Sequence, residues 1–267
     1  GARYDPIGDL RNRGWELRSR WRLHRGSAGW VVDLGAAWND NEVLALNPLP
    51  GADASPQIRQ GVQWTVVGHP VGGYWAQPLR WDDRDGNGVL VPSEINVESE
   101  ARFLGTPHPR LEVGIGSTWS YRDWTVHTRW IHRGGHHLRN LTEGYRCQVT
   151  LCRGFNDPTA PLADQARAQA VAIFPPDFFT EAGFIEDASV WRWAEAGVRW
   201  HLRTFAPAGG DLVLSVLGQN LATWTDYSGM DPEVNQFGAV DILARDFMTQ
   251  PPVRRWTVRV DVAAGPG

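Results

Sequence analysis

Apolar and polar residues alternate along the segment WELRSRWRLHR, residues 15–25. One set is Trp15, Leu17, Ser19, Trp21 and Leu23, and the other is Glu16, Arg18, Arg20, Arg22 and His24. Successive side chains of an extended strand point to opposite faces. The segment therefore predicts a strand with tryptophan on one face and arginine on the other.

The same alternation recurs in later segments, which predicts an all-β protein. The segments are WVVDLGAAW (30–38), LEVGIGSTWSY (111–121), WTVHTRWI (124–131), AEAGVRWHL (194–202), DLVLSVLGQ (211–219) and WTVRVDV (256–262). Residues 58–68, IRQGVQWTVVG, are a weaker eighth candidate. Only Arg122 and Asp123 separate two of these segments, which predicts a hairpin with a tight turn.

Tryptophan accounts for 15 of the 267 residues and tends to lie at strand ends. The examples are Trp15, Trp30, Trp38, Trp124, Trp130, Trp191 and Trp256. A transmembrane β-barrel has aromatic girdles at both edges of its lipid-facing apolar band and a polar inner face. In the core of a soluble sandwich, Phe, Ile and Leu usually outnumber Trp.

The pattern thus favours an antiparallel transmembrane β-barrel segment of seven or eight strands with long extracellular loops. The residues expected to face the lumen are Glu16, Arg18, Arg20, Arg22, Arg129, Glu195 and Arg199. The alternative is a secreted, soluble β module that is stiffened by calcium and binds glycans through Trp and Tyr.

Composition adds three limits. The net charge of −4 gives no reason to expect nucleic acid as a partner. No run of 18 or more apolar residues exists, which excludes a transmembrane helix, and the first residues lack the apolar stretch of a signal peptide. If the protein is exported, we expect its signal to lie upstream of residue 1.

Three long insertions are expected, at about residues 39–105, 133–190 and 218–255. The first contains DRDGNGVLVPSE, residues 83–94, whose oxygen-bearing residues have the spacing of a calcium loop. The expected ligands are Asp83, Asp85, Asn87, the backbone of Val89, and Glu94. An Asx-rich turn without an ion is the alternative. Because no helices of EF-hand quality flank this loop, we expect a static structural Ca²⁺ rather than a sensor.

The second insertion contains His132, His136 and His137. No carboxylate or cysteine completes a metal-ligand pattern with them, so a histidine-rich loop without metal is the preferred interpretation. Residues 161–174, PLADQARAQAVAIF, predict a short helix. Cys147 and Cys152 are expected to form a local disulfide, with two free thiols as the alternative.

The sequence shows no catalytic constellation: we find no nucleophile elbow, Cys/His pair or phosphate-binding glycine loop, and an enzyme is not expected. Aromatic residues of the insertions could instead contact a ligand. The candidates are Tyr74, Trp75, Trp224 and Tyr227, with packing inside the loops as the alternative.

Most of the chain from about residue 60 onward resembles the C-terminal part of a TonB-dependent outer-membrane receptor of the SusC/RagA-like branch. The resemblance rests on GHPVGGYWAQPL, DRDGNGVLVPSE, FLGTPHPRLEVGIG, TEGYRC, GFIEDASVWRWAE, GQNLATWTDYSGMDPEVN and RDFMTQPPVRRWTVRV, in this order. The segment GQNLATWTDYSGMDPEVN is the most specific of them. The loop cysteine of the family corresponds to Cys147, and the calcium-type loop to residues 83–94.

This resemblance implies that residues 1–267 supply roughly the last third of a barrel of about 22 strands. It also implies energy-coupled uptake of a large nutrient, such as an oligosaccharide or peptide, in the cell outer membrane of a Gram-negative bacterium. The implied partners are outer-membrane lipid, an N-terminal plug, the remaining barrel strands, the TonB complex and a SusD-like surface lipoprotein.

Two departures from the family pattern qualify these expectations. The sequence contains no plug and no TonB-contacting segment, so we expect a barrel fragment that does not couple to an energy source by itself. It ends in VDVAAGPG, without the terminal aromatic residue of the family. Seven or eight strands cannot close at the radius of such a barrel, which predicts an open, curved sheet.

Overall fold

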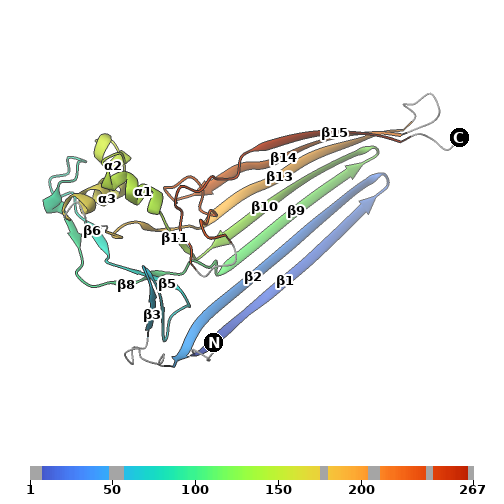
Figure 1. The fold of residues 1–267 in the computed structure, drawn as a ribbon. Helices are drawn as coiled ribbons and strands as arrows, with labels where there is room; N and C mark the ends of the chain where they lie inside the picture. Colours follow the sequence, from blue (N-terminus) through green and yellow to red (C-terminus); the bar gives the residue numbers. More distant parts are fainter. Residues whose placement is uncertain (1–7, 48–56, 175–179, 204–210, 239–242, 264–267) are drawn as a thin grey trace, which may run out of the picture.

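A computed structural model describes residues 8–47, 57–174, 180–203, 211–238 and 243–263. Its main element is a seven-stranded antiparallel sheet, the main sheet. In spatial order its strands are β1 (Gly8–Arg25), β2 (Ala28–Leu46), β9 (Leu111–Tyr121), β10 (Trp124–Gly134), β13 (Val190–Arg203), β14 (Asp211–Thr225) and β15 (Arg255–Ala263). The sheet is curved and open, with β1 and β15 at its edges (Figure 1). The predicted all-β, open antiparallel fold is confirmed.

The insertions build smaller elements. Four strands form one small sheet: β3 (Gln57–Gln60), β4 (Gln63–Val66), β5 (Gly73–Ala76) and β8 (Arg102–Gly105). Two strand pairs follow, β6 (Leu79–Trp81) with β7 (Ile95–Val97) and β11 (His137–Arg139) with β12 (Ile185–Asp187). The helices are η1 (Pro92–Glu94), α1 (Leu141–Gln148), α2 (Arg153–Asn156) and α3 (Leu162–Ala172). They lie at one end of the main sheet, and the β1–β2 and β9–β10 turns lie at the other (Figure 1).

The register separates two kinds of side chain across the main sheet. Directly opposed residues of antiparallel strands share a face. One row that crosses all seven strands, the apolar row, is Leu23, Trp30, Trp119, Val126, Val198, Val216 and Val258. A row on the opposite face, the polar row, is Arg20, Asp33, Gly116, Arg129, Glu195, Gln219 and Arg255. The alternation in the sequence therefore becomes one apolar and one polar face.

The third insertion starts later than the predicted residue 218, because a bulge lets strand β14 continue to Thr225. Trp193 opposes Ala222, whereas Glu195 opposes Gln219, so the two strands differ in the number of residues between these pairs. Asn220 takes a positive φ of 52° at this point. The one extra residue on β14 breaks the simple alternation after Gly218, yet β14 continues to Thr225. Likewise β2 continues to Leu46, beyond the predicted start of the first insertion at residue 39.

The weaker eighth strand candidate does not join the main sheet. Residues 58–68 instead form the β3–β4 hairpin, whose turn contains Gly61 at a positive φ of 63°. A glycine at this conformation avoids the steric cost that a side chain would bring. The chain therefore reverses in the middle of this apolar run and pairs locally with β5.

Among the described residues, most of the buried hydrophobic side chains lie in the insertions rather than in the main sheet. One apolar cluster joins Leu138, Ala188, Tyr227 and Val234, and another joins Cys147, Cys152, Ala168 and Phe184. By contrast, Trp15, Trp21, Trp119 and Trp256 are exposed on the apolar face. A soluble sandwich would bury these rings between two sheets. Among the described helices, none is long and apolar enough to cross a membrane.

Candidate functional site

Stacked aromatic rings mark two levels on the apolar face. Near the turn end, Trp30 stacks on Trp119 with ring centroids 6.1 Å apart, and Trp124 stacks on Trp200 at 5.0 Å. Near the insertion end, Trp130 lies between Trp193 at 5.4 Å and Trp224 at 5.7 Å. On the apolar face, the residues between these two levels are mainly Val, Leu, Ile and Ala. We call this region the aromatic-edged belt.

The height of the belt can be estimated from the strands. Trp130 lies six positions after Trp124, and Trp38 lies eight positions after Trp30. At about 3.4 Å per residue these paths measure about 20 and 27 Å. The apolar band of transmembrane barrels is about 25 Å tall.

Charged residues return on the same face immediately beyond the belt. Trp15 opposes Trp38, and the next positions of the same face hold Arg13 opposite Asp40 and Arg11 opposite Glu42. Both opposed pairs are ion pairs, and the Arg13 Nη2–Asp40 Oδ2 distance is 3.0 Å. The apolar face therefore changes to a charged surface at the level of the tryptophans.

The polar face holds the residues that the sequence assigned to a lumen. Glu16, Arg18, Arg20, Arg22, Arg129, Glu195 and Arg199 all lie on the face opposite the belt. Arg20 pairs with Asp33, and His127 Nε2 lies 3.1 Å from Glu195 Oε1. In the part of the chain that the structure describes, Arg18, Arg22, Arg129 and Arg199 have no ion pair. A hollow of about 770 Å³ on this face is lined by Arg18, Arg20, Asp33, His127, Arg129 and Glu195, among others.

Residues 83–94 form a compact loop whose oxygens converge. Candidate ligand atoms of Asp83, Asp85 and Glu94 all lie within 4.8 Å of one another. The Gly88 amide donates to Asp83 Oδ2 at 2.9 Å, and the Arg84 and Val91 amides donate to the Glu94 carboxylate at 3.0 and 3.1 Å. Asp83 Oδ1 is enclosed and has no hydrogen-bond partner among the described residues. The donor set therefore fits a hard cation with oxygen ligands.

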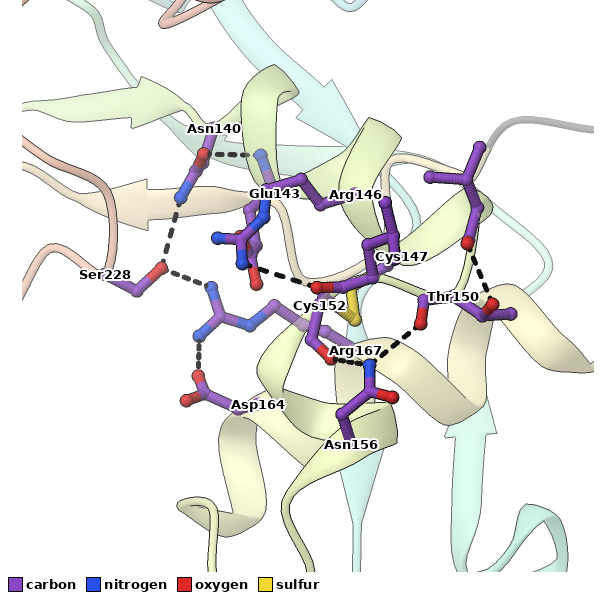
Figure 2. The surroundings of a disulfide bond; sticks show 12 residues. Asn140, Glu143, Arg146, Cys147, Thr150, Cys152, Asn156, Asp164, Arg167 and Ser228 are labelled. Carbon is purple, nitrogen blue, oxygen red and sulfur yellow. Dashed lines mark hydrogen bonds and ion pairs between the residues drawn. A yellow bond between two sulfur atoms is a disulfide. The ribbon is translucent and has the colours of Figure 1, made fainter.

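The cysteines form the predicted disulfide. The Cys147–Cys152 bond joins the end of α1 to the start of α2, and both residues are buried (Figure 2). Its sulfurs pack with Ala168 of α3 and with Phe184. The bond therefore connects the three helices of the second insertion to one small core. The predicted helix within residues 161–174 is α3 and is confirmed.

Hydrogen bonds from buried side chains connect the second insertion to the third. Asn140 donates from Nδ2 to Ser228 Oγ at 3.1 Å (Figure 2). The same Nδ2 donates to Glu186 Oε1 at 2.9 Å. Arg167 of α3 donates to Ser228 Oγ at 2.9 Å and pairs with Glu186 and Asp164. Because Asn140 and Arg167 are both buried, these bonds are shielded from competing water.

Tyr74 connects the first insertion to the third, and Tyr227 joins two parts of the third insertion. Tyr74 is fully buried in the first insertion, and its hydroxyl donates to the Ala244 carbonyl at 2.6 Å. Tyr227 is also buried and donates to Asp246 Oδ2 at 3.0 Å. Burial raises the pKa of both phenols. Their burial and their bonded hydroxyls support the alternative, packing inside the loops, over contact of Tyr74 and Tyr227 with a ligand.

The two candidate tryptophans differ from these tyrosines. Trp224 is exposed on the apolar face and stacks on Trp130, so it belongs to the aromatic-edged belt rather than to a ligand site. Trp75 stacks on Trp64 with centroids 5.4 Å apart and is half-buried. We call the joined elements from the three insertions, residues 57–110, 135–189 and 226–247 where described, the loop cluster.

The histidines of the second insertion are not brought together as metal ligands. His132 lies in β10 and stacks on Trp191 at 4.6 Å. His136 is buried, and burial lowers its pKa to about 4. Among the described residues, the groups of three candidate ligands contain no histidine.

We expect the loop cluster to lose stability as pH falls because of His136. Its pKa is about 4 in the fold, against about 6.5 in an unfolded chain. The contribution of neutral His136 to the free energy of unfolding is therefore fully present above pH 6.5, and it is lost as pH falls toward 4. Linkage gives a loss of about 2 kcal/mol between pH 7 and pH 5. Hydrogen exchange of residues 135–145 at both pH values would measure it.

The control for this prediction is His136→Asn, compared with wild type at the same two pH values. Burial raises the pKa of Glu181 and of Asp246, which opposes the histidine effect, so only the difference between the two proteins isolates His136. Asp187, Glu233, Arg133 and His137 also act on His136 and are the same in both proteins. An equal pH response of the two proteins would contradict the prediction.

Removing the disulfide should loosen the helices and leave the main sheet intact. Closing a loop this short restricts the unfolded chain by about 2 kcal/mol in the chain-entropy model. We expect the double variant Cys147→Ala, Cys152→Ala to exchange the amides of α1 and α2 roughly 30-fold faster. Hydrogen exchange resolved by segment checks this, with β9 and β10 as the internal control. Equal acceleration in β9 and β10 would refute a local role.

Comparison with known proteins supports the resemblance inferred from the sequence. No family model matches the chain. The TonB-dependent receptor P26 of Formosa agariphila is 24% identical over 271 residues, a match that covers 87% of this chain and 26% of that protein. The chain thus spans about a quarter of the length of this relative.

Solved structures give the same result for the fold. A chain of the RagAB peptide transporter superposes with a TM-score of 0.64 at 13% identity and covers 95% of this chain and 29% of that one. The RagAB peptide importer in its closed-closed state gives 0.66 at 14% identity, again over 95% of this chain and 29% of the other. The predicted resemblance to TonB-dependent receptors of the SusC/RagA-like branch is confirmed.

Proposed function

We propose that this chain forms part of the wall and outer vestibule of an outer-membrane barrel for TonB-dependent uptake of a large nutrient. The observation that carries the proposal is the aromatic-edged belt, which crosses all seven strands opposite a polar face. Exposing such a belt to water is unfavourable, whereas a bilayer accommodates it, with tryptophan at the two interfaces. The polar row then faces an aqueous lumen. The similarity to a TonB-dependent receptor supports the same reading.

The open edges of the main sheet fit this role. β1 and β15 each have one side without a partner strand among the described elements. Unpaired backbone groups are costly in a bilayer, so strands within it form closed barrels. We infer that both edges pair with further strands of a larger barrel. The loop cluster, at one end of the sheet, then lies at the outer mouth.

The polar face also bears on the substrate class. The arginines of the polar face that lack an ion pair can donate hydrogen bonds to a polar cargo such as an oligosaccharide or peptide. The alternative partners for these arginines are the carboxylates of a plug. The RagAB structures are described as a peptide transporter and importer. For this chain, uptake in partnership with a SusD-like surface lipoprotein is part of the proposal.

A partition and quenching experiment tests the membrane assignment. The chain is expressed with an export signal in a Gram-negative host, and its recovery in outer membranes or in aqueous buffer is compared. In vesicles that carry brominated lipids, we expect tryptophan fluorescence to fall strongly, because most of the belt tryptophans lie near the interfaces. A monodisperse soluble protein with fluorescence insensitive to brominated lipid would overturn the assignment. It would favour the secreted glycan-binding module instead.

A further inference from the structure

We propose that Arg13 and Arg110, just beyond the aromatic-edged belt, bind the anionic phosphate of a lipid head group in the outer leaflet. Both guanidinium groups pair with one carboxylate, that of Asp40. We call Arg13, Arg110 and Asp40, together with the neighbouring Arg11–Glu42 pair, the arginine rim. This assignment rests on the proposed membrane position of the belt, and it adds the residues that meet the lipid head groups.

The arginines of β1 change face at Trp15. Between residues 16 and 24 the arginines lie at even positions on the polar face, whereas Arg11 and Arg13 share the odd positions of Trp15 and of the apolar face. At the level of the rim, the polar face carries the neutral Asn12, which is bonded to its opposite neighbour on β2. Arginine at the end of a membrane-spanning segment reaches into the head-group layer, where its charge is solvated. The change of face therefore marks the level at which the outer side of β1 leaves the hydrocarbon.

The first insertion covers the inner side of the strands at this level, so the rim faces away from the loop cluster. The Val71 amide donates to Asn41 Oδ1 at 2.8 Å, and the Val43 amide donates to the His69 carbonyl at 3.0 Å. Asn41 and Val43 lie at odd positions of β2, whereas Asp40 lies at an even position, so the two sets point to opposite faces. In the proposed barrel, the face of the rim is the one that meets lipid.

Positive charge is outermost in the rim. The Asp40 side chain is 16% exposed, whereas the Arg13 and Arg110 side chains are 61% and 49% exposed. Two guanidinium groups share this one carboxylate, so one positive charge remains unbalanced. Glu42 does not balance it, because Glu42 pairs with Arg11. The rim therefore presents a cationic surface to the head-group layer, where anionic lipids are attracted to it.

The two guanidinium groups retain donors for a phosphate. Guanidinium groups bind phosphate through parallel N–H groups, and each carries five N–H donors. Among the described residues, Arg13 gives two of its donors to Asp40, and Arg110 gives one. Enough donors remain for the two arginines to hold one phosphate between them.

The depth of the rim selects a lipid rather than dissolved phosphate. The Arg110 guanidinium lies 5.9 Å from the centroid of the Trp38 ring, which closes the belt at its insertion end. Tryptophan rings of membrane proteins lie at the level of the head groups. Arg13 lies two positions beyond Trp15, which opposes Trp38, and thus about 7 Å further along the strand. The rim therefore lies at the depth of the head-group phosphates.

Native mass spectrometry of the full chain in detergent tests the rim, with phosphatidylglycerol as the anionic probe and phosphatidylcholine as its zwitterionic counterpart. Both lipids carry a phosphate, but only phosphatidylglycerol has a net negative charge. One unbalanced basic residue near a membrane surface strengthens the binding of anionic lipid about fivefold. We therefore expect the first phosphatidylglycerol to bind at least about fivefold more tightly than the first phosphatidylcholine. Equal affinities for the two lipids overturn the inference.

Single substitutions locate the bound lipid. Arg13→Gln and Arg110→Gln should each remove most of the preference for phosphatidylglycerol, because the rim then has no excess positive charge. Asp40→Asn should raise the preference, because both guanidinium groups then lack their anionic neighbour. An unchanged preference in both arginine variants overturns the inference, since the lipid then lies elsewhere or the rim contacts another partner, such as a protein.

Arg153→Gln is the matched control for these variants. Arg153 is 54% exposed and pairs with Asp157, so its exposure and its single carboxylate partner resemble those of Arg13. It lies in α2 of the loop cluster, away from the main sheet (Figure 1). We expect Arg153→Gln to keep the full preference. A loss equal to that in Arg13→Gln would show that net charge, rather than the rim, sets the preference, and would overturn the inference.

Failure here is distinguishable from failure of the proposed function. Recovery in outer membranes and quenching by brominated phosphatidylcholine test the belt and do not depend on head-group charge. If the chain stays soluble and its fluorescence is insensitive to lipid, the proposed barrel and the lipid contact of the rim both fail. If the chain enters membranes as expected but shows no preference for phosphatidylglycerol, only the lipid contact of the rim fails.

Discussion

Ile115→Arg is expected to block stable insertion of the chain into a bilayer. Ile115 opposes Leu34 on β2 and Trp130 on β10, so it lies within the aromatic-edged belt. An arginine on the lipid face of a transmembrane barrel costs about 2–4 kcal/mol near the midplane and about 0–1 kcal/mol near the interfaces. Although Ile115 opposes Trp130 at one edge of the belt, its other partner Leu34 lies midway between Trp30 and Trp38, so we expect a cost of about 2 kcal/mol. We expect the variant to be depleted from outer membranes. In vesicles, its free energy of unfolding in urea should fall by that amount.

The matched control is Thr118→Arg, three residues along the same strand. Thr118 opposes Val31 and His127 on the polar face, where an added arginine meets water in the proposed barrel. Its insertion and stability should stay within about 0.5 kcal/mol of wild type. If the two variants insert equally well, the apolar face does not contact lipid and the proposed orientation fails.

Arg192→Met should release the third insertion from the main sheet. Arg192 Nη2 lies 2.8 and 2.9 Å from the two oxygens of Asp231, and its Nε lies 2.6 Å from Glu233. The Arg192 and Asp231 side chains are only 6% and 5% exposed. Removing the arginine leaves a buried carboxylate unpaired, which costs about 3–5 kcal/mol. Residues 226–238 should become sensitive to proteolysis and exchange their amides much faster.

Arg199→Met on the same strand is the control, because Arg199 has no ion pair among the described residues. This variant should leave the proteolysis of residues 226–238 unchanged. The double variant Arg192→Met, Asp231→Asn should recover part of the loss, since it removes the unpaired charge. Unaltered protection of residues 226–238 in Arg192→Met would show that other contacts hold this insertion.

The contacts between insertions suggest why the loop cluster contains so many buried polar groups. Each pair of insertions shares at least one hydrogen bond in which at least one partner is buried: Tyr74 with Ala244, Gln165 with Leu90, and Asn140 with Ser228. Directional bonds between buried groups specify one arrangement more strictly than apolar contacts do. At the mouth of a barrel, such a cluster would give a cargo a fixed surface.

The strands and their two faces could be predicted from the sequence, and so could the local chemistry of two loops. Alternation has a period of two residues and is set by the geometry of an extended chain, so neighbours along the chain reveal it. The spacing from Asp83 to Glu94 and the closeness of Cys147 to Cys152 are equally local. For this reason the faces, the shape of the calcium-type loop and the disulfide all agree with the structure.

Tertiary structure alone decided the rest. Residues 58–68 have strand character, but pairing with β5 placed them in a small sheet. A bulge at Asn220 carried β14 past the point where its alternation breaks. Tyr74 and Tyr227 lie in polar segments that suggest exposure, yet both are buried, and the Tyr74 hydroxyl meets a partner 170 residues away. Gln165 reaches a loop 75 residues earlier in the chain. Such contacts depend on how the strands arrange the insertions in space, which no local pattern encodes.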